Sequence, residues 1–248
     1  MFIRKILDIL IPPRCPNCGL EVDADNKLCA CCWKEIHFTT EPFCKKCGQP
    51  LEHGMSDNQM DCQCATCFDN KPDYDGGRSV LSYDGTAKTL LLRFKHGDAT
   101  YMACLFASWM KQYEDNFFKE SDYLIPVPLH WTRLLKRRYN QSSLLAISLL
   151  KVLKKKPSYA PFMLRRKRRT PSQGHKTAQQ RYDNVHKAFI VPDRYHAQLK
   201  GKNVLLIDDV MTTGATLQEC SHTLKQAGCS KVFILTVARV GASFMKSC

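Results

Sequence analysis

Two adjacent carboxylates, Asp208 and Asp209, follow a run of four apolar residues, Val204 to Ile207. Carboxylates can accept hydrogen bonds from sugar hydroxyls or help to hold Mg²⁺. A turn of small and hydroxylated residues comes next, comprising Thr212, Thr213, Gly214, Ala215 and Thr216. The backbone N–H groups and hydroxyls of such a turn can hold a phosphate at the start of a helix. Together these residue types indicate a sugar-phosphate site.

The hydrophobic pattern around this stretch predicts a strand, a turn and a helix. A continuous apolar run is typical of a strand in a parallel sheet that is covered on both faces. Ligands of such sheets bind beyond the carboxyl ends of the strands. Thr216 and Glu219 have the spacing of a capping box, which predicts Thr216 as the N-cap. The helix is expected to bury one apolar face and to end before Gly228; this face comprises Leu217, Cys220, Leu224 and Ala227.

Residues 204–216 closely resemble the motif with which type I phosphoribosyltransferases bind phosphoribosyl pyrophosphate (PRPP). That motif is a hydrophobic run, two acidic residues and a threonine- and glycine-containing phosphate loop, all of which are present here. The resemblance implies that residues 212–216 bind the 5′-phosphate of PRPP and that Asp208 and Asp209 bind its ribose hydroxyls. It also implies Mg²⁺ on the pyrophosphate, with Asp209 and Arg169 as candidate catalytic residues.

Alternating strands and helices follow residue 72, which predicts an α/β fold with a doubly wound parallel sheet. The Pro72–Gly77 segment marks the expected boundary between a Cys-rich module, residues 1–72, and a phosphoribosyltransferase-like domain, residues 73–248. Further strands are predicted at residues 78–83, 122–128, 162–164 and 231–238, and further helices at residues 86–95, 101–113 and 142–153.

Ten of the fourteen cysteines lie between Cys15 and Cys67, mostly as Cys-x-x-Cys pairs. Two such knuckles supply the four thiolates of a tetrahedral Zn²⁺ site. A nucleotide-type motif implies a reducing cytoplasm, so zinc ligation is favoured over disulfides. Two structural zinc sites are therefore predicted, with a single site as the alternative, and Cys31 or Cys62 could replace a neighbouring ligand. The predicted ligands are Cys15, Cys18, Cys29 and Cys32 in one site, and Cys44, Cys47, Cys64 and Cys67 in the other.

The net charge of +14 is concentrated in the second domain. Residues 1–72 contain eight Lys/Arg and ten Asp/Glu, so the Cys-rich module is not basic and is interpreted as a metal-stapled segment. A docking surface for DNA or protein is the alternative. Residues 123–182 contain fifteen Lys/Arg and no acidic residue, which favours pyrophosphate, nucleic acid or both as ligands. Trp131 and Tyr139 lie among these arginines, as in sequence-tolerant sites for single-stranded DNA.

Two basic segments are candidates to contact pyrophosphate. One follows the predicted strand at residues 122–128. The other lies within residues 160–190 and is predicted to be a mobile lid, because it is a polar and basic loop inside an α/β domain. A cation at the end of the helix predicted at residues 86–95 completes the set. The candidate pyrophosphate and lid residues are Lys95, Arg137, Arg138, Asn140, Gln141, Arg169, Gln173 and Arg181.

Four cysteine knuckles precede a domain with several further motifs, Pro126-Val-Pro128, Arg138-Tyr-Asn-Gln141, Arg169-Thr-x-x-Gln173 and Arg181-x-x-Asn184-x-x-x-Ala188-Phe189. This combination resembles the ComF family (the ComFC/GntX group) over nearly the whole chain. The family's usual Arg-Gly-Phe-Asn-Gln stands here as Arg138-Tyr139-Asn140-Gln141 preceded by Arg137, so its glycine is replaced or shifted.

The resemblance implies a role in natural transformation, in which imported single-stranded DNA is handled on the cytoplasmic side of the inner membrane. The expected partners are single-stranded DNA, PRPP, and a DNA-import helicase or other competence proteins at that membrane. An active phosphoribosyltransferase with an unidentified acceptor is the alternative. The sequence contains no run of about eighteen apolar residues, so no transmembrane helix is expected. Residues 1–13 are expected to form a short amphipathic helix that packs on the protein, with a membrane-surface anchor as the alternative.

Overall fold

The computed structural model describes residues 12–51, 62–96, 99–168 and 177–241. The helix predicted at residues 1–13 falls almost wholly outside these ranges, as do Arg169 and Gln173 of the predicted lid. Among the described helices, none has the length and apolarity that crossing a membrane requires.

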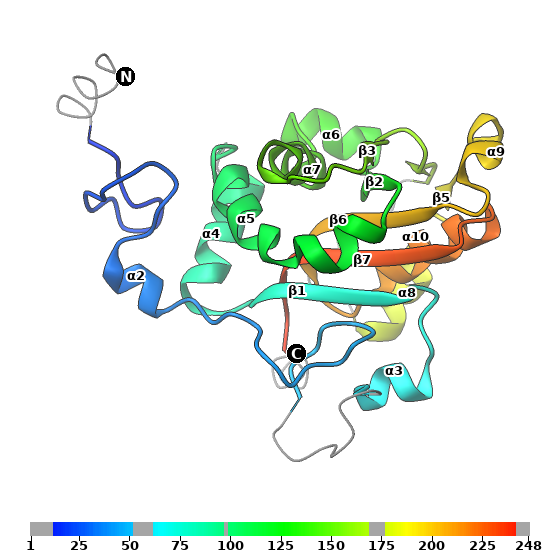
Figure 1. The fold of residues 1–248 in the computed structure, drawn as a ribbon, viewed down its shortest axis with the longest axis horizontal. Helices are drawn as coiled ribbons and strands as arrows, with labels where there is room; N and C mark the ends of the chain where they lie inside the picture. Colours follow the sequence, from blue (N-terminus) through cyan, green and yellow to red (C-terminus); the bar gives the residue numbers. More distant parts are fainter. Residues whose placement is uncertain (1–11, 52–61, 97–98, 169–176, 242–248) are drawn as a thin grey trace.

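A parallel sheet of five strands forms the centre of the molecule (Figure 1). The strand order is β1-β7-β6-β2-β3, and every neighbouring pair is parallel. The α/β fold expected from the sequence is confirmed. The strands are β1 (Gly76–Ser82), β2 (Tyr123–Pro126), β3 (Ser158–Tyr159), β6 (Asn203–Met211) and β7 (Lys231–Arg239).

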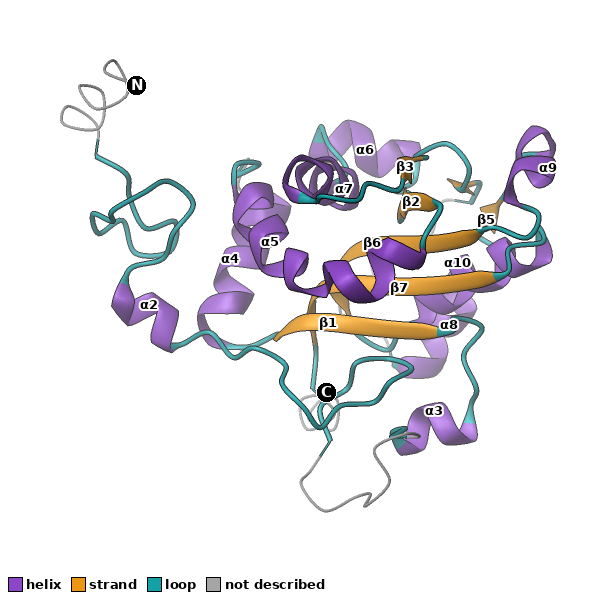
Figure 2. Cartoon of the chain, in the orientation of Figure 1, coloured by secondary structure: helices purple, strands orange, loops and turns teal. Residues whose placement is uncertain are grey.

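Helices cover both faces of this sheet, and the central strand β6 shows why its sequence is apolar throughout (Figure 2). Leu205 and Ile207 join one hydrophobic core, whereas Val204 and Leu206 join the other. Successive side chains of a strand point to opposite faces, so a strand between two cores needs an apolar residue at each position. The first core is closed by α4 (Gly85–His96), α5 (Met102–Met110) and α7 (Gln141–Val152), and the second by α10 (Ala215–Gln226) and β5 (Phe189–Ile190).

Shorter elements connect these layers. The predicted strand at residues 162–164 is wrong, because these residues form turns after Pro161 and bury Met163 and Leu164 in the second core without strand pairing. The neighbouring Arg165–Arg166 pairs instead with β5 as a short antiparallel sheet. The remaining elements are α2 (Ala30–Lys34), α3 (Ala65–Asp69), a 3₁₀ helix (Lys111–Tyr113), a π-helix (Glu114–Phe118), α6 (Trp131–Arg137), β4 (Arg165–Arg166), α8 (Ala178–Val185), a second 3₁₀ helix (Asp193–Tyr195) and α9 (His196–Leu199).

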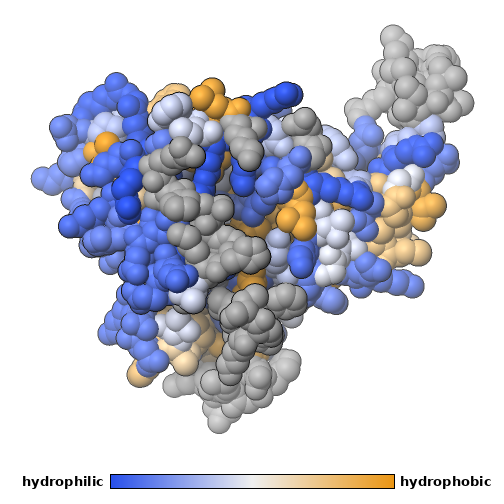
Figure 3. Space-filling model, turned by 180° about the vertical axis from the view of Figure 1, so that it is seen from behind, coloured by the Kyte–Doolittle hydropathy of each residue, from blue (hydrophilic) through white to orange (hydrophobic). Residues whose placement is uncertain are grey.

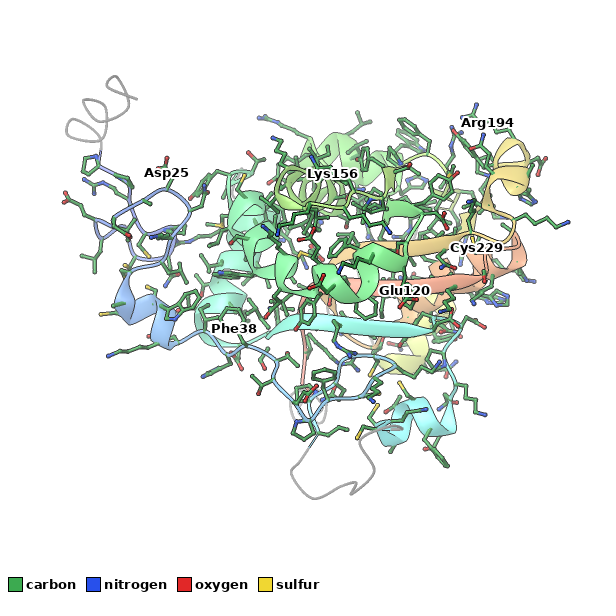
Figure 4. The ribbon with its side chains drawn as sticks, viewed as in Figure 1. Asp25, Phe38, Glu120, Lys156, Arg194 and Cys229 are labelled. Carbon is green, nitrogen blue, oxygen red and sulfur yellow. The ribbon has the colours of Figure 1, made fainter. Side chains whose placement is uncertain are left out.

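The Cys-rich module covers the open edge of the sheet at β1. The backbone N–H of Ser82 donates to the carbonyl of His37 at 2.9 Å, and that of Thr39 donates to the carbonyl of Val80 at 2.9 Å. Phe38 lies between these two bonds, opposite Leu81 near the end of β1 (Figure 4). Pairing of this kind reduces the backbone groups that the edge offers to another chain. The domain boundary at residue 72 stays a prediction.

Candidate functional site

The phosphate loop lies between the end of β6 and the start of α10. Gly214 is the N-cap residue, with φ +81°, and it provides no side-chain cap. The hydroxyl of Thr213 accepts a hydrogen bond from the backbone N–H of Ala215 at 3.4 Å. The amino end of a helix carries partial positive charge and backbone donors, so this turn can receive an anion.

The predicted capping box at Thr216 and Glu219 is wrong, because the N-cap is Gly214 and α10 begins at Ala215, two residues earlier than predicted. The carboxylate of Glu219 does not reach back to the helix start. Its Oε1 accepts instead from the backbone N–H of Lys187 at 2.7 Å, which joins α10 to the turn before β5. The predicted apolar face of the helix is confirmed, since Leu217, Cys220, Leu224 and Ala227 are all buried, and Gly228 ends the helix with φ +94°.

The two carboxylates occupy different environments near the end of β6. Oδ1 of Asp208 accepts from the hydroxyl of Ser142 at 2.9 Å and from the backbone N–H of Asp209 at 2.9 Å. Oδ2 of Asp209 forms an ion pair with Nζ of Lys95 at 3.2 Å. Burial, followed by the neighbouring charge of Asp209, raises the pKa of Asp208 to about 7. Asp209 thus pairs with a lysine, whereas Asp208 is bonded to a hydroxyl and a backbone N–H.

This raised pKa predicts a pH dependence that Asp208→Asn removes. The folded protein keeps the proton of Asp208 at pH values where the unfolded chain, with a pKa near 3.8, has lost it. The free energy of unfolding should therefore fall as the pH rises from about 4 to about 7. Urea unfolding should show that the stability of Asp208→Asn relative to the wild type increases across this range. The increase should be on the order of 1–2 kcal/mol at pH 7.5.

The same substitution at the exposed Asp69 of α3 is the control. Parallel stability curves for the wild type and Asp208→Asn would contradict the assignment.

Residues at the start of α7 hold the neighbouring loop in place. Asn140 caps the helix by accepting from the backbone N–H of Ser142, and its Nδ2 donates to the carbonyl of Val127 at 3.0 Å. Nε2 of the buried Gln141 donates to the carbonyl of Lys95 at 3.3 Å, and its Oε1 accepts from Nη1 of Arg137 at 3.4 Å. The predicted residues Lys95, Arg137, Asn140 and Gln141 are thus brought together next to the aspartates.

Arg138 has φ +65°, in the left-handed region that glycine tolerates best. It ends α6 and immediately precedes Tyr139, whose hydroxyl donates to the carbonyl of Phe94 at 3.0 Å. The backbone thus keeps a conformation suited to glycine at Arg138. The glycine of the usual family motif is therefore replaced by Arg138 rather than shifted along the chain.

The segment that was expected to be a lid is described only on either side of residues 169–176, so the lid stays a prediction. Thr177 caps α8 through a capping box with Gln180, and Arg181 lies within that helix. Nη2 of Arg168 donates to the carbonyls of Asn184 and His186 at 3.2 and 2.7 Å, so Arg168 holds the end of α8. Arg168 therefore has a structural role, although it is exposed.

Arg166 and Ser142 lie near the aspartates but are absent from the set that the sequence predicted. The guanidinium of Arg166 lies 5.2 Å from the ring centroid of Phe189. Burial lowers the pKa of Arg166 to about 10, and the nearby charge of Asp208 acts in the opposite direction. Neither residue belongs to a recognisable motif, and the position of Arg166 depends on the β4–β5 pairing that the pattern did not predict.

The eight predicted zinc ligands form two separate clusters. Within each cluster, the four sulfur atoms all lie within 4.8 Å of one another. Sγ of Cys18 is 3.5 Å from that of Cys29, and Sγ of Cys47 is 3.7 Å from that of Cys64. Four thiolates around one tetrahedral Zn²⁺ are separated by about 3.8 Å, so both clusters fit the ion. Within the described residues, neither cluster includes Cys31 or Cys62.

The two clusters differ in how they are built into the molecule. Cys18 of the first cluster is exposed, and this ribbon reaches the sheet domain at α4, where Arg93 donates to the carbonyls of Pro16 and Asn17 at 2.7 Å. In the second cluster Cys44 and Cys47 are 0% and 1% exposed, and all four of its cysteines belong to the second hydrophobic core. The first ribbon is therefore an appendage, whereas the second is part of the core.

Comparison with known proteins identifies both modules. The model of the double zinc ribbon domain matches residues 6–69, and that of the phosphoribosyl transferase domain matches residues 140–247. Competence protein ComFC of Bacillus subtilis is 30% identical over 211 residues, covering 82% of this chain and 80% of the relative. The chain belongs to the ComF family.

Other relatives carry related descriptions. Competence protein F of Haemophilus influenzae is 29% identical over 233 residues, covering 91% of this chain and 96% of the relative. The DNA utilization protein YhgH of Escherichia coli is 24% identical over 237 residues, covering 93% and 99%. Among solved structures, a hypoxanthine phosphoribosyltransferase of Staphylococcus aureus matches with a TM-score of 0.34 and 15% identity, over 54% of this chain and 62% of that one.

Proposed function

We propose that this ComF-family chain acts in natural transformation, where it handles imported single-stranded DNA and binds PRPP with Mg²⁺. Its relatives in Haemophilus influenzae and Bacillus subtilis are named competence proteins. The place of action is the cytoplasm, including the surface of the inner membrane, where a DNA-import helicase or other competence proteins would be partners.

The observation that carries the PRPP proposal is the position of the aspartates beside the amino end of α10. Gly214 opens that helix, and Asp208 and Asp209 precede it on β6. The 5′-phosphate would bind the N–H groups and hydroxyls of residues 212–216, while the carboxylates would accept hydrogen bonds from the ribose hydroxyls. Magnesium would neutralise the pyrophosphate, together with the predicted cations Lys95, Arg137, Arg181 and Arg169. Gln173 would donate a hydrogen bond to it.

Calorimetry with Mg²⁺ and PRPP tests this site. The wild type is expected to bind, and Asp209→Asn is expected to bind more weakly because it loses both a ribose acceptor and the partner of Lys95. Asp84→Asn removes a carboxylate that pairs with His37 elsewhere and is the matched control. Absence of binding heat in the wild type would refute the PRPP proposal.

A basic and aromatic surface at α6 supports the DNA proposal. Trp131 is 64% exposed and Leu135 73% exposed, next to Arg133, Arg137 and Arg138. The molecule in Figure 3 has an apolar patch among hydrophilic atoms at its upper end, where α6 lies in Figure 1. Exposed aromatic rings among cations can stack on the bases of single strands. Tyr139 is less suited to stacking, since its hydroxyl is bound to the carbonyl of Phe94.

Trp131→Ala is expected to weaken binding of a single-stranded oligonucleotide roughly tenfold at low salt, because one stacking contact is lost. Phe68→Ala removes a ring that is 74% exposed on the zinc ribbon and should leave the affinity unchanged.

Arg165→Gln with Lys167→Gln should reduce the salt dependence of binding, since both side chains are exposed. Fluorescence anisotropy measures all three, and equal affinities for Trp131→Ala and Phe68→Ala would exclude α6 as the contact.

Turnover of PRPP is the second candidate function. The raised pKa of Asp208 favours it, because a carboxyl group that titrates near neutral pH can exchange a proton with a reacting ligand. Pyrophosphate release measured across the nucleobases tests this function. Release with one base would identify the acceptor, whereas binding of PRPP without release would assign a sensing role to the site.

A further inference from the structure

A buried arginine connects the second zinc ribbon to the phosphate loop. Arg239 ends β7 and is 7% exposed. Its Nε donates to Oε1 of Gln49 at 2.6 Å, and its Nη1 donates to the carbonyl of Cys47 at 3.1 Å. Nη1 also lies 2.9 Å from Sδ of Met211, the last residue of β6. One guanidinium thus contacts a zinc-ligating knuckle and the residue that leads into the phosphate loop.

The side chain of Met211 packs against the backbone of the phosphate loop at Gly214. A Cβ atom placed on Gly214 would lie 2.6 Å from Cε of Met211 and 3.9 Å from Oη of Tyr74. The backbone of Met211 is held as well, since its carbonyl accepts from the N–H of Val240 at 3.0 Å. A shift of the Met211 side chain would therefore remove the surface against which Gly214 rests.

The chain that leaves the second ribbon also holds the start of α10. The backbone N–H of Asp73 donates to Oε1 of Gln218 at 3.0 Å, and Oδ2 of Asp73 accepts from Nε2 of Gln218 at 2.7 Å. His222, one turn further along α10, lies 3.1 Å from the same carboxylate oxygen. The ribbon thus contacts the phosphate loop through Arg239 and the helix behind it through Asp73.

We propose that Arg239 is a positioning residue through which the second zinc ribbon sets the shape of the phosphate loop. Zinc binding by Cys44, Cys47, Cys64 and Cys67 and anion binding by residues 212–216 are then coupled. Coupling between two sites is reciprocal, so a ligand on the loop strengthens the hold on zinc. The part that concerns PRPP rests on the proposed function, whereas the effect of Arg239 on the loop does not.

Amide hydrogen exchange of the zinc-loaded full chain tests this effect without any ligand. Arg239→Gln and Met211→Leu should raise exchange at residues 212–217 about tenfold, while the core helices α5 and α7 keep their protection. Arg78→Gln is the matched control, because Arg78 lies on β1 and also contacts this ribbon, through the carbonyl of Lys45 at 3.3 Å and the ring centroid of Phe43 at 3.9 Å. Unchanged exchange of the loop in both Arg239→Gln and Met211→Leu would overturn the proposal, as would an equal increase in Arg78→Gln.

Release of zinc to a chelator tests the reciprocal effect. Mg²⁺ with PRPP should slow the loss of one of the two zinc ions in the wild type, by about fivefold or more, and should not do so in Met211→Leu. Bound PRPP without any slowing in the wild type would contradict the coupling. Absence of PRPP binding would refute the proposed function instead, and hydrogen exchange would still decide whether Arg239 positions the loop.

Discussion

Cys47→Ser is expected to lower the free energy of unfolding by roughly 5 kcal/mol or more, which approaches the whole stability of many domains. Cys47 is 1% exposed and packs in the second hydrophobic core together with Tyr74, Val204 and Leu206. Loss of this zinc would leave thiol groups without their metal inside the core and would release the ribbon from the β1 edge. The core, the sheet edge and the metal site should therefore lose their structure in one cooperative transition.

Cys18→Ser removes a ligand of the first cluster and is the matched comparison. Because Cys18 is exposed and the first ribbon contacts the sheet domain at α4, the cost should be about 1–2 kcal/mol, with only one zinc lost. Urea unfolding combined with zinc quantification measures both variants. Equal losses of stability would show that the two ribbons contribute alike and would contradict the distinction drawn from their burial.

Gly214→Ala is expected to weaken PRPP binding roughly 100-fold, because a left-handed residue is strained and the added methyl group overlaps Met211. The φ of Gly214 is +81°, and the new Cβ would lie 2.6 Å from Cε of Met211. Relief of this overlap must move either the loop or the methionine. Both movements change the positions of the N–H groups that are proposed to hold the 5′-phosphate.

Gly201→Ala separates the strain from the overlap. Gly201 has φ +72°, but nothing lies within 4 Å of a Cβ atom placed there. Both substitutions should lower the free energy of unfolding by about 1–2 kcal/mol. Only Gly214→Ala should show weakened PRPP binding in calorimetry. Retention of normal affinity by Gly214→Ala would show that the loop does not bind the phosphate.

The parts of the fold that were predicted correctly depend on local patterns. The continuous apolar runs predicted β6 and β7, and the helical pattern predicted α4 and the buried face of α10. The paired spacing of the cysteines predicted which eight would cluster. In each of these cases the neighbours that decide the structure are close in sequence, or the ligand spacing itself carries the information.

The incorrect predictions depend on contacts between distant segments. The partner of Glu219 is the backbone of Lys187, which no local pattern indicates, so the capping box with Thr216 looked complete. The antiparallel pairing of β4 with β5 joins Arg166 to Phe189, across more than twenty residues, and no local pattern indicated it. For the same reason, only the structure shows that Arg166 lies near the aspartates and that Arg239 contacts Met211 before the phosphate loop.

Pairing of β1 with β7 has a consequence for how the protein is made. Residues 76–82 pair with residues 233–239, so the strand that joins β1 to the rest of the sheet is the last of the described strands to leave the ribosome. Until then, the second ribbon and β1 lack the surface on which they pack, including Arg239. Contacts so distant in sequence form slowly and leave strand edges exposed in the meantime. The nascent chain should therefore depend on chaperones and on available zinc until synthesis has passed β7.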